Sequence, residues 1–135
     1  MPPLLVCSSA AAVLAQQIGL YGHSGPVQPG WFPAADKAQH GLGFALPMFL
    51  VLTTLESYAA RAGRTLRPLW PAVVSGLFAV NAVVSELYQA RPGSGRSGDP
   101  FDTVADLVGI ALGWLSFRLL RDRWFTGWPR RQVDA

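Results

Sequence analysis

The chain has 135 residues, of which 50% are hydrophobic and only 14% are charged. A soluble domain usually carries about 25% charged residues, so this composition indicates lipid rather than water as the main solvent. The net charge of +3 does not indicate a nucleic-acid-binding protein, because the arginines stand at the ends of apolar runs. The single cysteine, Cys7, excludes an internal disulfide framework and has no Cys or His neighbour with which to form a zinc site.

The first two apolar runs predict helices over 3–20 and 38–60. A helix needs about 20 mostly apolar residues to cross a bilayer, and both runs approach that length. The first run is interrupted by Gln16 and Gln17 and has no flanking charge that would fix its position. The second contains Pro47, which a membrane helix tolerates as a kink.

The third and fourth apolar runs predict helices over 69–89 and 102–120. Nothing is charged between Arg67 and Glu86, so the third run has the strongest signal of the four. The fourth carries charges near both ends but keeps a purely apolar centre over 107–117, which can span if the two ends lie at the membrane interface.

These runs predict an all-α fold, an integral membrane bundle of four transmembrane helices that forms one domain over 1–135. Short cytoplasmic connections carry an excess of arginine and lysine. Three arginines stand in 61–67 and four in the basic tail, 121–135, so both segments are predicted to be cytoplasmic. The protein would then lie in the cytoplasmic membrane with both termini inside, and the connections 21–39 and 90–101 would face outward.

Polar side chains, most of them ionisable, collect at three places that this topology brings to the outer membrane face. They are the start of the second helix, the end of the third and the start of the fourth. A charged side chain at the centre of a membrane helix costs about 2.5–3.5 kcal/mol on insertion scales, so such positions are informative. The groups are Asp36, Lys37 and His40, then Glu86 and Gln89, then Asp99, Asp102 and Asp106. We expect a polar pocket between the helices at this face.

Two glycines on the fourth helix favour close packing at this pocket. Gly109 and Gly113 follow Asp102 and Asp106 along one stripe of the helix, at spacings of three or four residues. Small residues let a membrane helix approach a neighbour closely. We therefore expect the side chains of the two aspartates to lie close to Glu86 or His40.

The polar residues occur in three motifs: Asp36-Lys37-x-x-His40, Glu86-x-x-Gln89, and Arg96 followed by Asp102, Asp106, Gly109 and Gly113. In order and spacing they resemble the VanZ-like family of bacterial membrane proteins, named for a teicoplanin-resistance protein. The likeness covers 31–120. It departs from the family at Asp106, where Asn is more frequent, so the charge of the site is in question. The resemblance implies an envelope-associated role in bacteria, linked to glycopeptide resistance.

Our leading hypothesis is a binding protein or resistance factor that recognises an anionic component of the cell envelope. Arg96 and Lys37 would contact the anion, while the other polar groups position it. The predicted ligand-binding residues are Asp36, Lys37, His40, Glu86, Gln89, Arg96, Asp102 and Asp106. Membrane lipids are the other expected partners. The sequence predicts no metal site and identifies neither a cofactor nor an oligomeric state.

Two other classes of function remain open at this stage. One is an enzyme that acts on a lipid-linked or peptidoglycan-type substrate by acid/base chemistry. Its candidate catalytic residues are Glu86, His40, Asp102 and Asp106. A metal-assisted variant would use the carboxylates as ligands. The other class is a purely structural bundle, in which the polar groups only fix the pairing of the helices.

The structural interpretation makes specific expectations for single residues. His40 would bond to Asp36 or to a backbone carbonyl, and Glu86 would form a buried pair with Lys37 or Arg96. Asp99, followed by Pro100 at the first helical position, would cap the fourth helix. The side chains expected to form hydrogen bonds between helices are Asn81, Ser85 and Gln89.

Overall fold

The computed structural model describes residues 2–22, 35–92, 94 and 98–125, and the regular structure within these ranges is entirely α-helical. The helices are α1 (Pro2–Tyr21), α2 (Ala35–Arg61), α3 (Leu69–Gln89) and α4 (Pro100–Phe125). All four are long and apolar enough to cross a membrane. The predicted all-α bundle of four transmembrane helices is confirmed, and the chain is a multi-pass membrane protein.

Two helices are longer than the sequence predicts. α2 begins at Ala35 rather than at 38, and α4 continues to Phe125 rather than ending at 120. The 27 residues of α2 span about 40 Å, which exceeds a hydrocarbon core of about 30 Å. Its ends therefore reach the headgroup region, where charged residues do not interrupt a helix. The predicted basic tail accordingly begins inside α4, and its part beyond Phe125 lies outside the described residues.

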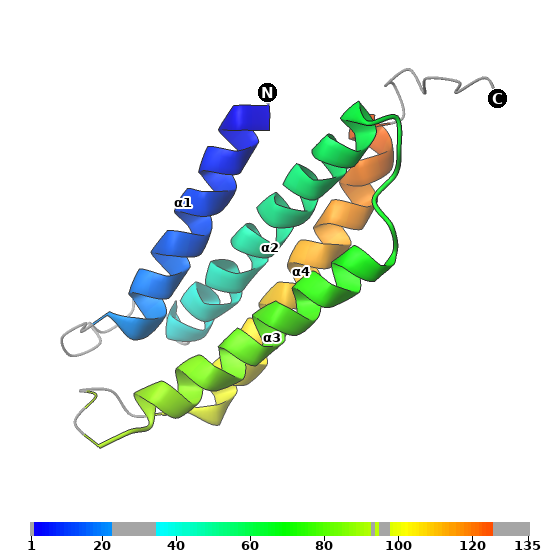
Figure 1. Ribbon diagram of the computed structural model, residues 1–135. Helices are drawn as coiled ribbons and strands as arrows, with labels where there is room; N and C mark the ends of the chain where they lie inside the picture. Colours follow the sequence, from blue (N-terminus) through cyan, green and yellow to red (C-terminus); the bar gives the residue numbers. More distant parts are fainter. Residues whose placement is uncertain (1, 23–34, 93, 95–97, 126–135) are drawn as a thin grey trace.

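Successive helices alternate in direction, so α2 and α4 run parallel to each other (Figure 1). α2 makes its largest interface with α4 and also packs against α1 and α3. The end of α1, the start of α2, the end of α3 and the start of α4 all lie at one end of the bundle, drawn at the bottom of Figure 1. We call this end the lower end and the opposite end the upper end.

The backbones of α2 and α4 touch at two glycines. A Cβ atom added to Gly109 would lie 2.1 Å from the carbonyl oxygen of Gly41, and one added to Gly113 would lie 2.4 Å from that of Ala45. No side chain larger than hydrogen fits at either position. The predicted close approach of α4 is confirmed, and the neighbour that it approaches is α2.

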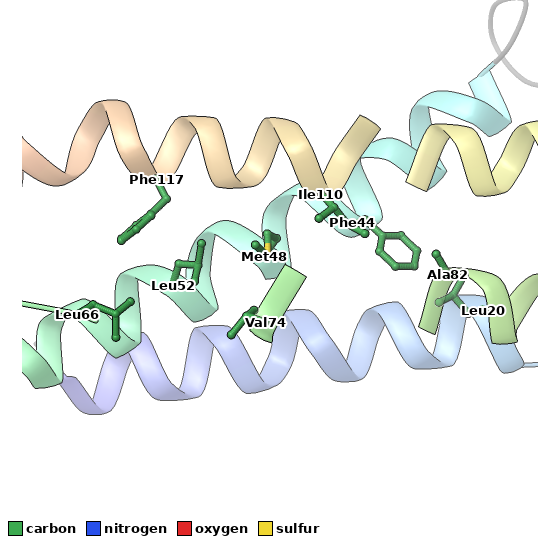
Figure 2. Close-up of a cluster of buried hydrophobic side chains, with 9 residues drawn as sticks. All are labelled: Leu20, Phe44, Met48, Leu52, Leu66, Val74, Ala82, Ile110 and Phe117. Atoms are coloured by element: carbon green, nitrogen blue, oxygen red, sulfur yellow. The ribbon is translucent and has the colours of Figure 1, made fainter. Parts of the chain in front are cut away.

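A line of large side chains on α2 forms the centre of the bundle. Phe44, Met48 and Leu52 succeed one another at intervals of one turn and are at most 1% exposed. Ile110 and Phe117 of α4 belong to the same cluster (Figure 2). Its other members, from the rest of the bundle, are Leu20, Leu66, Val74 and Ala82.

The outer surface of the bundle is apolar. On α3, for example, Leu77, Val80 and Leu87 are each more than 60% exposed. An exposed apolar surface of this extent is unfavourable in water but matches the hydrocarbon of a bilayer. The helices therefore expose to lipid what a soluble bundle would bury.

Polar side chains join α1 to α2 near the upper end. The hydroxyls of Ser9 and Thr54 lie 2.8 Å apart, and Thr54 also donates to the Leu5 carbonyl at 3.3 Å. Ser9 and Thr54 are both buried. Small hydroxyl side chains commonly form hydrogen bonds of this kind between membrane helices.

Two of the three predicted hydrogen-bonding side chains on α3 do link helices. Asn81 accepts a hydrogen bond from the Tyr21 hydroxyl at 3.1 Å, and Gln89 donates to the Leu20 carbonyl at 3.0 Å. Both bonds connect α3 to α1. The prediction is wrong for Ser85, whose hydroxyl donates to a carbonyl of its own helix. A serine hydroxyl is short enough to reach the preceding turn, which satisfies it locally.

The contact between α2 and α4 predicts that one methyl group added at Gly109 lowers the stability of the bundle strongly. Gly109→Ala should lower the free energy of unfolding by about 1–3 kcal/mol, because the two helices must separate to admit the methyl group. Gly76→Ala on α3 is the matched control, since a Cβ there meets nothing within 4 Å. Thermal unfolding of both variants in detergent measures the effect. Equal melting temperatures for the two variants would contradict the contact.

Candidate functional site: a polar cluster at the lower end

The three polar segments meet at the lower end of the bundle. We call the assembled residues the polar cluster: Asp36, Lys37 and His40 of α2, Glu86 of α3, Asp99 just before α4, and Asp102 and Asp106 of α4. The predicted convergence on one level is confirmed. Because α2 and α4 are parallel and in direct backbone contact, their first turns lie side by side and hold most of the cluster.

Lys37 is the centre of the polar cluster. Its Nζ lies 3.0 Å from Asp36, 2.5 Å from Asp99 and 2.6 Å from Asp102. An ammonium group has three N–H donors, and here three carboxylates receive them. Lys37, which is the only lysine of the chain, therefore ties the first turn of α2 to the start of α4.

His40 forms a second link between the same helices. Its Nδ1 lies 2.9 Å from Oδ1 of Asp106, and its Nε2 lies 3.6 Å from Oδ2 of Asp102. The side chains of His40 and Asp106 are only 10% and 2% exposed. The sequence offered Asp36 or a backbone carbonyl as the partner of His40, and the structure places Asp106 and Asp102 beside the ring while Asp36 pairs with Lys37. A histidine oriented by a buried carboxylate can transfer a proton at its other ring nitrogen.

Asp99 caps α4, as the sequence predicts. Its side chain accepts a hydrogen bond of 2.9 Å from the backbone N–H of Phe101, and Pro100 occupies the first helical position. The Lys37 ammonium and the Phe101 amide both hold the pKa of Asp99 below its ordinary value. The Asp99 carboxylate thus accepts a hydrogen bond from the first turn of α4 and also pairs with the Lys37 ammonium.

Glu86 enters the polar cluster from α3. Its Oε1 is buried and has no hydrogen-bond partner among the described residues, while the backbone amide of Asp99 bonds to the carboxylate. A Cβ added to Gly98 would lie 2.9 Å from this Oε1, so the chain passes very close to it. The expected partner of Glu86 was Lys37 or Arg96; three aspartates occupy the Lys37 ammonium, and Arg96 lies outside the described residues. The half-buried Glu86 side chain therefore keeps one buried oxygen without a hydrogen bond to any described residue.

The polar cluster is rich in acid. Five carboxyl groups surround one ammonium and one imidazole in the part of the chain that the structure describes. An anion can reach Lys37 only if it displaces one of the three aspartates. The remaining hydrogen-bonding capacity consists mainly of carboxylate acceptors, which suit hydroxyl or amino groups of a ligand.

Two predicted ligand-binding residues are not among the described members of the polar cluster. Gln89 is buried against α1, where it binds the Leu20 carbonyl. Arg96 lies outside the described residues. Across 2–22, 35–92, 94 and 98–125, no three His, Cys, Asp or Glu side chains are placed to hold a metal ion.

A buried ion pair at the upper end was not predicted. Glu56 of α2 is 2% exposed, and its Oε2 lies 3.2 Å from Nε of Arg121 on α4. The same oxygen accepts a hydrogen bond of 3.3 Å from the Leu66 amide. Glu56 follows the uncharged stretch 41–55, a signal that could have drawn attention to it. Its carboxylate anchors the α2–α3 connection to α4.

A groove between α1 and α2 also escaped the sequence analysis. It encloses a cavity of about 320 Å³ beside the polar cluster, and His40 lines both. Gln16, which the sequence marks only as an interruption of the first apolar run, faces this groove. Whether two membrane helices leave a groove between them depends on their tilt, which sequence periodicity does not specify.

Comparison of the chain with protein-family models, with curated proteins and with solved structures finds no match. The resemblance to the VanZ-like family therefore stays a prediction. The multi-pass bundle and the polar cluster rest on the structure of this chain alone.

The ion pair between Lys37 and Asp99 predicts a dependence of stability on pH. A carboxyl whose pKa is lower in the folded state stabilises the fold above its ordinary value of 3.8, and this contribution is lost as the pH falls through the folded pKa. Asp99→Asn should therefore lower the melting temperature at pH 7 and have a smaller effect near pH 3.

The Lys37→Met background is the control for this measurement. Without the ammonium, the largest cause of the lowered pKa is gone, and Asp99→Asn should change the melting temperature less at every pH. Melting curves of the four proteins in detergent between pH 3 and pH 7 complete the cycle. An effect of Asp99→Asn that is the same in both backgrounds would exclude the coupling.

Proposed function

We propose that this chain is a VanZ-like protein of the bacterial cytoplasmic membrane whose polar cluster recognises a component of the cell envelope. The observation that carries the proposal is the buried Oε1 of Glu86, which has no hydrogen-bond partner among the described residues and lies inside a network of charged groups. A network that served only to pair helices should leave few buried acceptors unused, because each such atom costs about 1–3 kcal/mol. A ligand that donates to Glu86 would recover this energy.

The chemistry of the polar cluster supports a ligand of mixed character. Hydroxyl or amino groups would donate to the carboxylates, and Glu86 has an acceptor oxygen that no described residue uses. The anionic part expected from the sequence would contact Arg96 and would reach Lys37 by displacing one aspartate. Phosphorylated, lipid-linked precursors of the envelope carry both kinds of group.

The proposal also assigns the polar cluster to the outer membrane face. Arg61, Arg64 and Arg67 accumulate at the upper end, in or just before the connection between α2 and α3, and arginine excess marks cytoplasmic connections. The lower end would then face outward, toward envelope components and toward glycopeptides.

Cysteine accessibility in intact cells tests this orientation. In a Cys7→Ser background, Ser94→Cys lies at the lower end and Thr65→Cys at the upper end. An impermeant maleimide should label Ser94→Cys in whole cells and Thr65→Cys only after the membrane is opened. The reverse pattern would place the polar cluster in the cytoplasm and would refute a glycopeptide-facing role.

A resistance assay tests the function itself. Expression of the protein in a teicoplanin-susceptible bacterium should raise the minimal inhibitory concentration several-fold. Glu86→Gln and His40→Gln should abolish the increase, because each removes a group that contacts the ligand. Asp122→Asn, an exposed position near the upper end of α4, should retain it. No increase with the parent protein, at a membrane level verified by immunoblot, would refute the resistance role.

An enzymatic function is the second candidate, and the pairing of His40 with Asp106 favours it. The 2.9 Å contact orients the imidazole as in a general base, and His40 also lines the groove that opens beside the cluster. Titrating expression in the same assay separates the two candidates. A binding protein should give resistance that rises in proportion to its amount, whereas a catalyst should give full resistance at low amounts.

A further inference from the structure

The groove between α1 and α2 opens toward lipid. Leu42 and Leu46 of α2 line it and are 69% and 55% exposed. Their side chains are thus about as exposed as the apolar side chains on the outer surface of the bundle. Gly19 and Gly43 also line it, and a Cβ added at either position would meet nothing within 4 Å. The cavity therefore opens laterally into the hydrocarbon of the bilayer. Its walls leave room for the acyl chain of a lipid.

One buried polar group in the groove has an unused donor. Gln16 is 7% exposed, and its Nε2 forms no hydrogen bond with any residue that the structure describes. A polar group in a membrane is expensive to bury without a partner. The opposite wall contains Pro47, whose missing N–H cannot serve the Gly43 carbonyl one turn earlier. The groove thus offers a polar contact at Gln16 within a mainly apolar wall, whose other polar side chains are Gln39 and His40.

We propose that this groove binds one chain of a diacyl lipid and that an ester carbonyl of the lipid accepts a hydrogen bond from Nε2 of Gln16. Gln16 lies five residues before Tyr21, the last residue of α1, or about 7.5 Å along the axis. Because His40 of the charged polar cluster lines the same groove, we place Gln16 near the headgroup level, where ester carbonyls reside. The acyl chain of the lipid would continue along the groove past Gly43 and Leu46.

This lipid site goes beyond the proposed recognition of an envelope component and does not depend on it. The two are nevertheless neighbours, because His40 lines the groove and belongs to the polar cluster. A lipid held by Gln16 would have its headgroup beside the cluster. Failure of the resistance assay would leave the lipid site untouched, and the reverse also holds.

The first experiment fills the groove. Gly43→Leu places a side chain in open space, so the fold should persist, whereas the lipid chain should be excluded. Gly76→Leu on α3 is the matched control, because that glycine also has nothing within 4 Å and lies outside the groove. Native mass spectrometry of the detergent-purified proteins with added dioleoyl phosphatidylglycerol should show bound lipid on the parent protein and on Gly76→Leu only. Equal retention by all three folded proteins would overturn the site.

The second experiment isolates the hydrogen bond. Phosphatidylglycerol with two ester-linked oleoyl chains should bind about 3- to 10-fold more tightly than its diether analogue, which has no carbonyl. Gln16→Met should remove this preference, while Gln17→Met, outside the groove, should keep it. Equal binding of the two lipids to the parent protein would overturn the contact with Gln16.

Discussion

The backbone contact between α2 and α4 is the constraint on which the rest of the molecule depends. Because α2 and α4 run parallel and Gly109 and Gly113 have no side chains, the carbonyls of Gly41 and Ala45 rest directly against α4. This contact fixes both the separation and the register of the two helices. In a bilayer, where lipid tails are as apolar as leucine, such close packing replaces the hydrophobic driving force of a soluble bundle.

The register set by the glycines determines the polar cluster. His40 directly precedes Gly41, and Asp106 precedes Gly109 by three residues, so the contact that joins the glycines also joins the histidine to the aspartate. One turn closer to the lower end, the same register places Lys37 beside Asp102. A shift of one residue in either helix would separate both pairs.

How much of this arrangement can be read from the sequence depends on how local the signal is. The helices and the convergence of the three polar segments follow from apolar runs and from counting membrane crossings, which are local properties. The close approach of Gly109 and Gly113 also follows from their spacing. The partner of each charge does not, because Lys37 could reach carboxylates on two helices, and only the register selects Asp99 and Asp102 over Glu86.

The features that the sequence did not reveal are those that require helices to be placed in space. Glu56 and Arg121 each read as an ordinary charge near the end of an apolar run, and only the bundle brings them to 3.2 Å. The groove beside Gln16 depends on the tilt of α1 against α2. Both arise between segments that are distant along the chain, where residue spacing carries no information.

The two ends of the bundle differ in how completely their charges are satisfied. At the upper end, Glu56 has Arg121 and the Leu66 amide on one oxygen and stabilises a connection between helices. At the lower end, Glu86 keeps a buried oxygen without a partner among the described residues. Gln16, in the adjoining groove, has an unused donor in the described part of the chain. Structural networks are completed because each unpaired group costs stability, whereas a binding site keeps such groups for its ligand. This contrast supports the proposal that recognition takes place at the lower end, and it does so without reference to any relative.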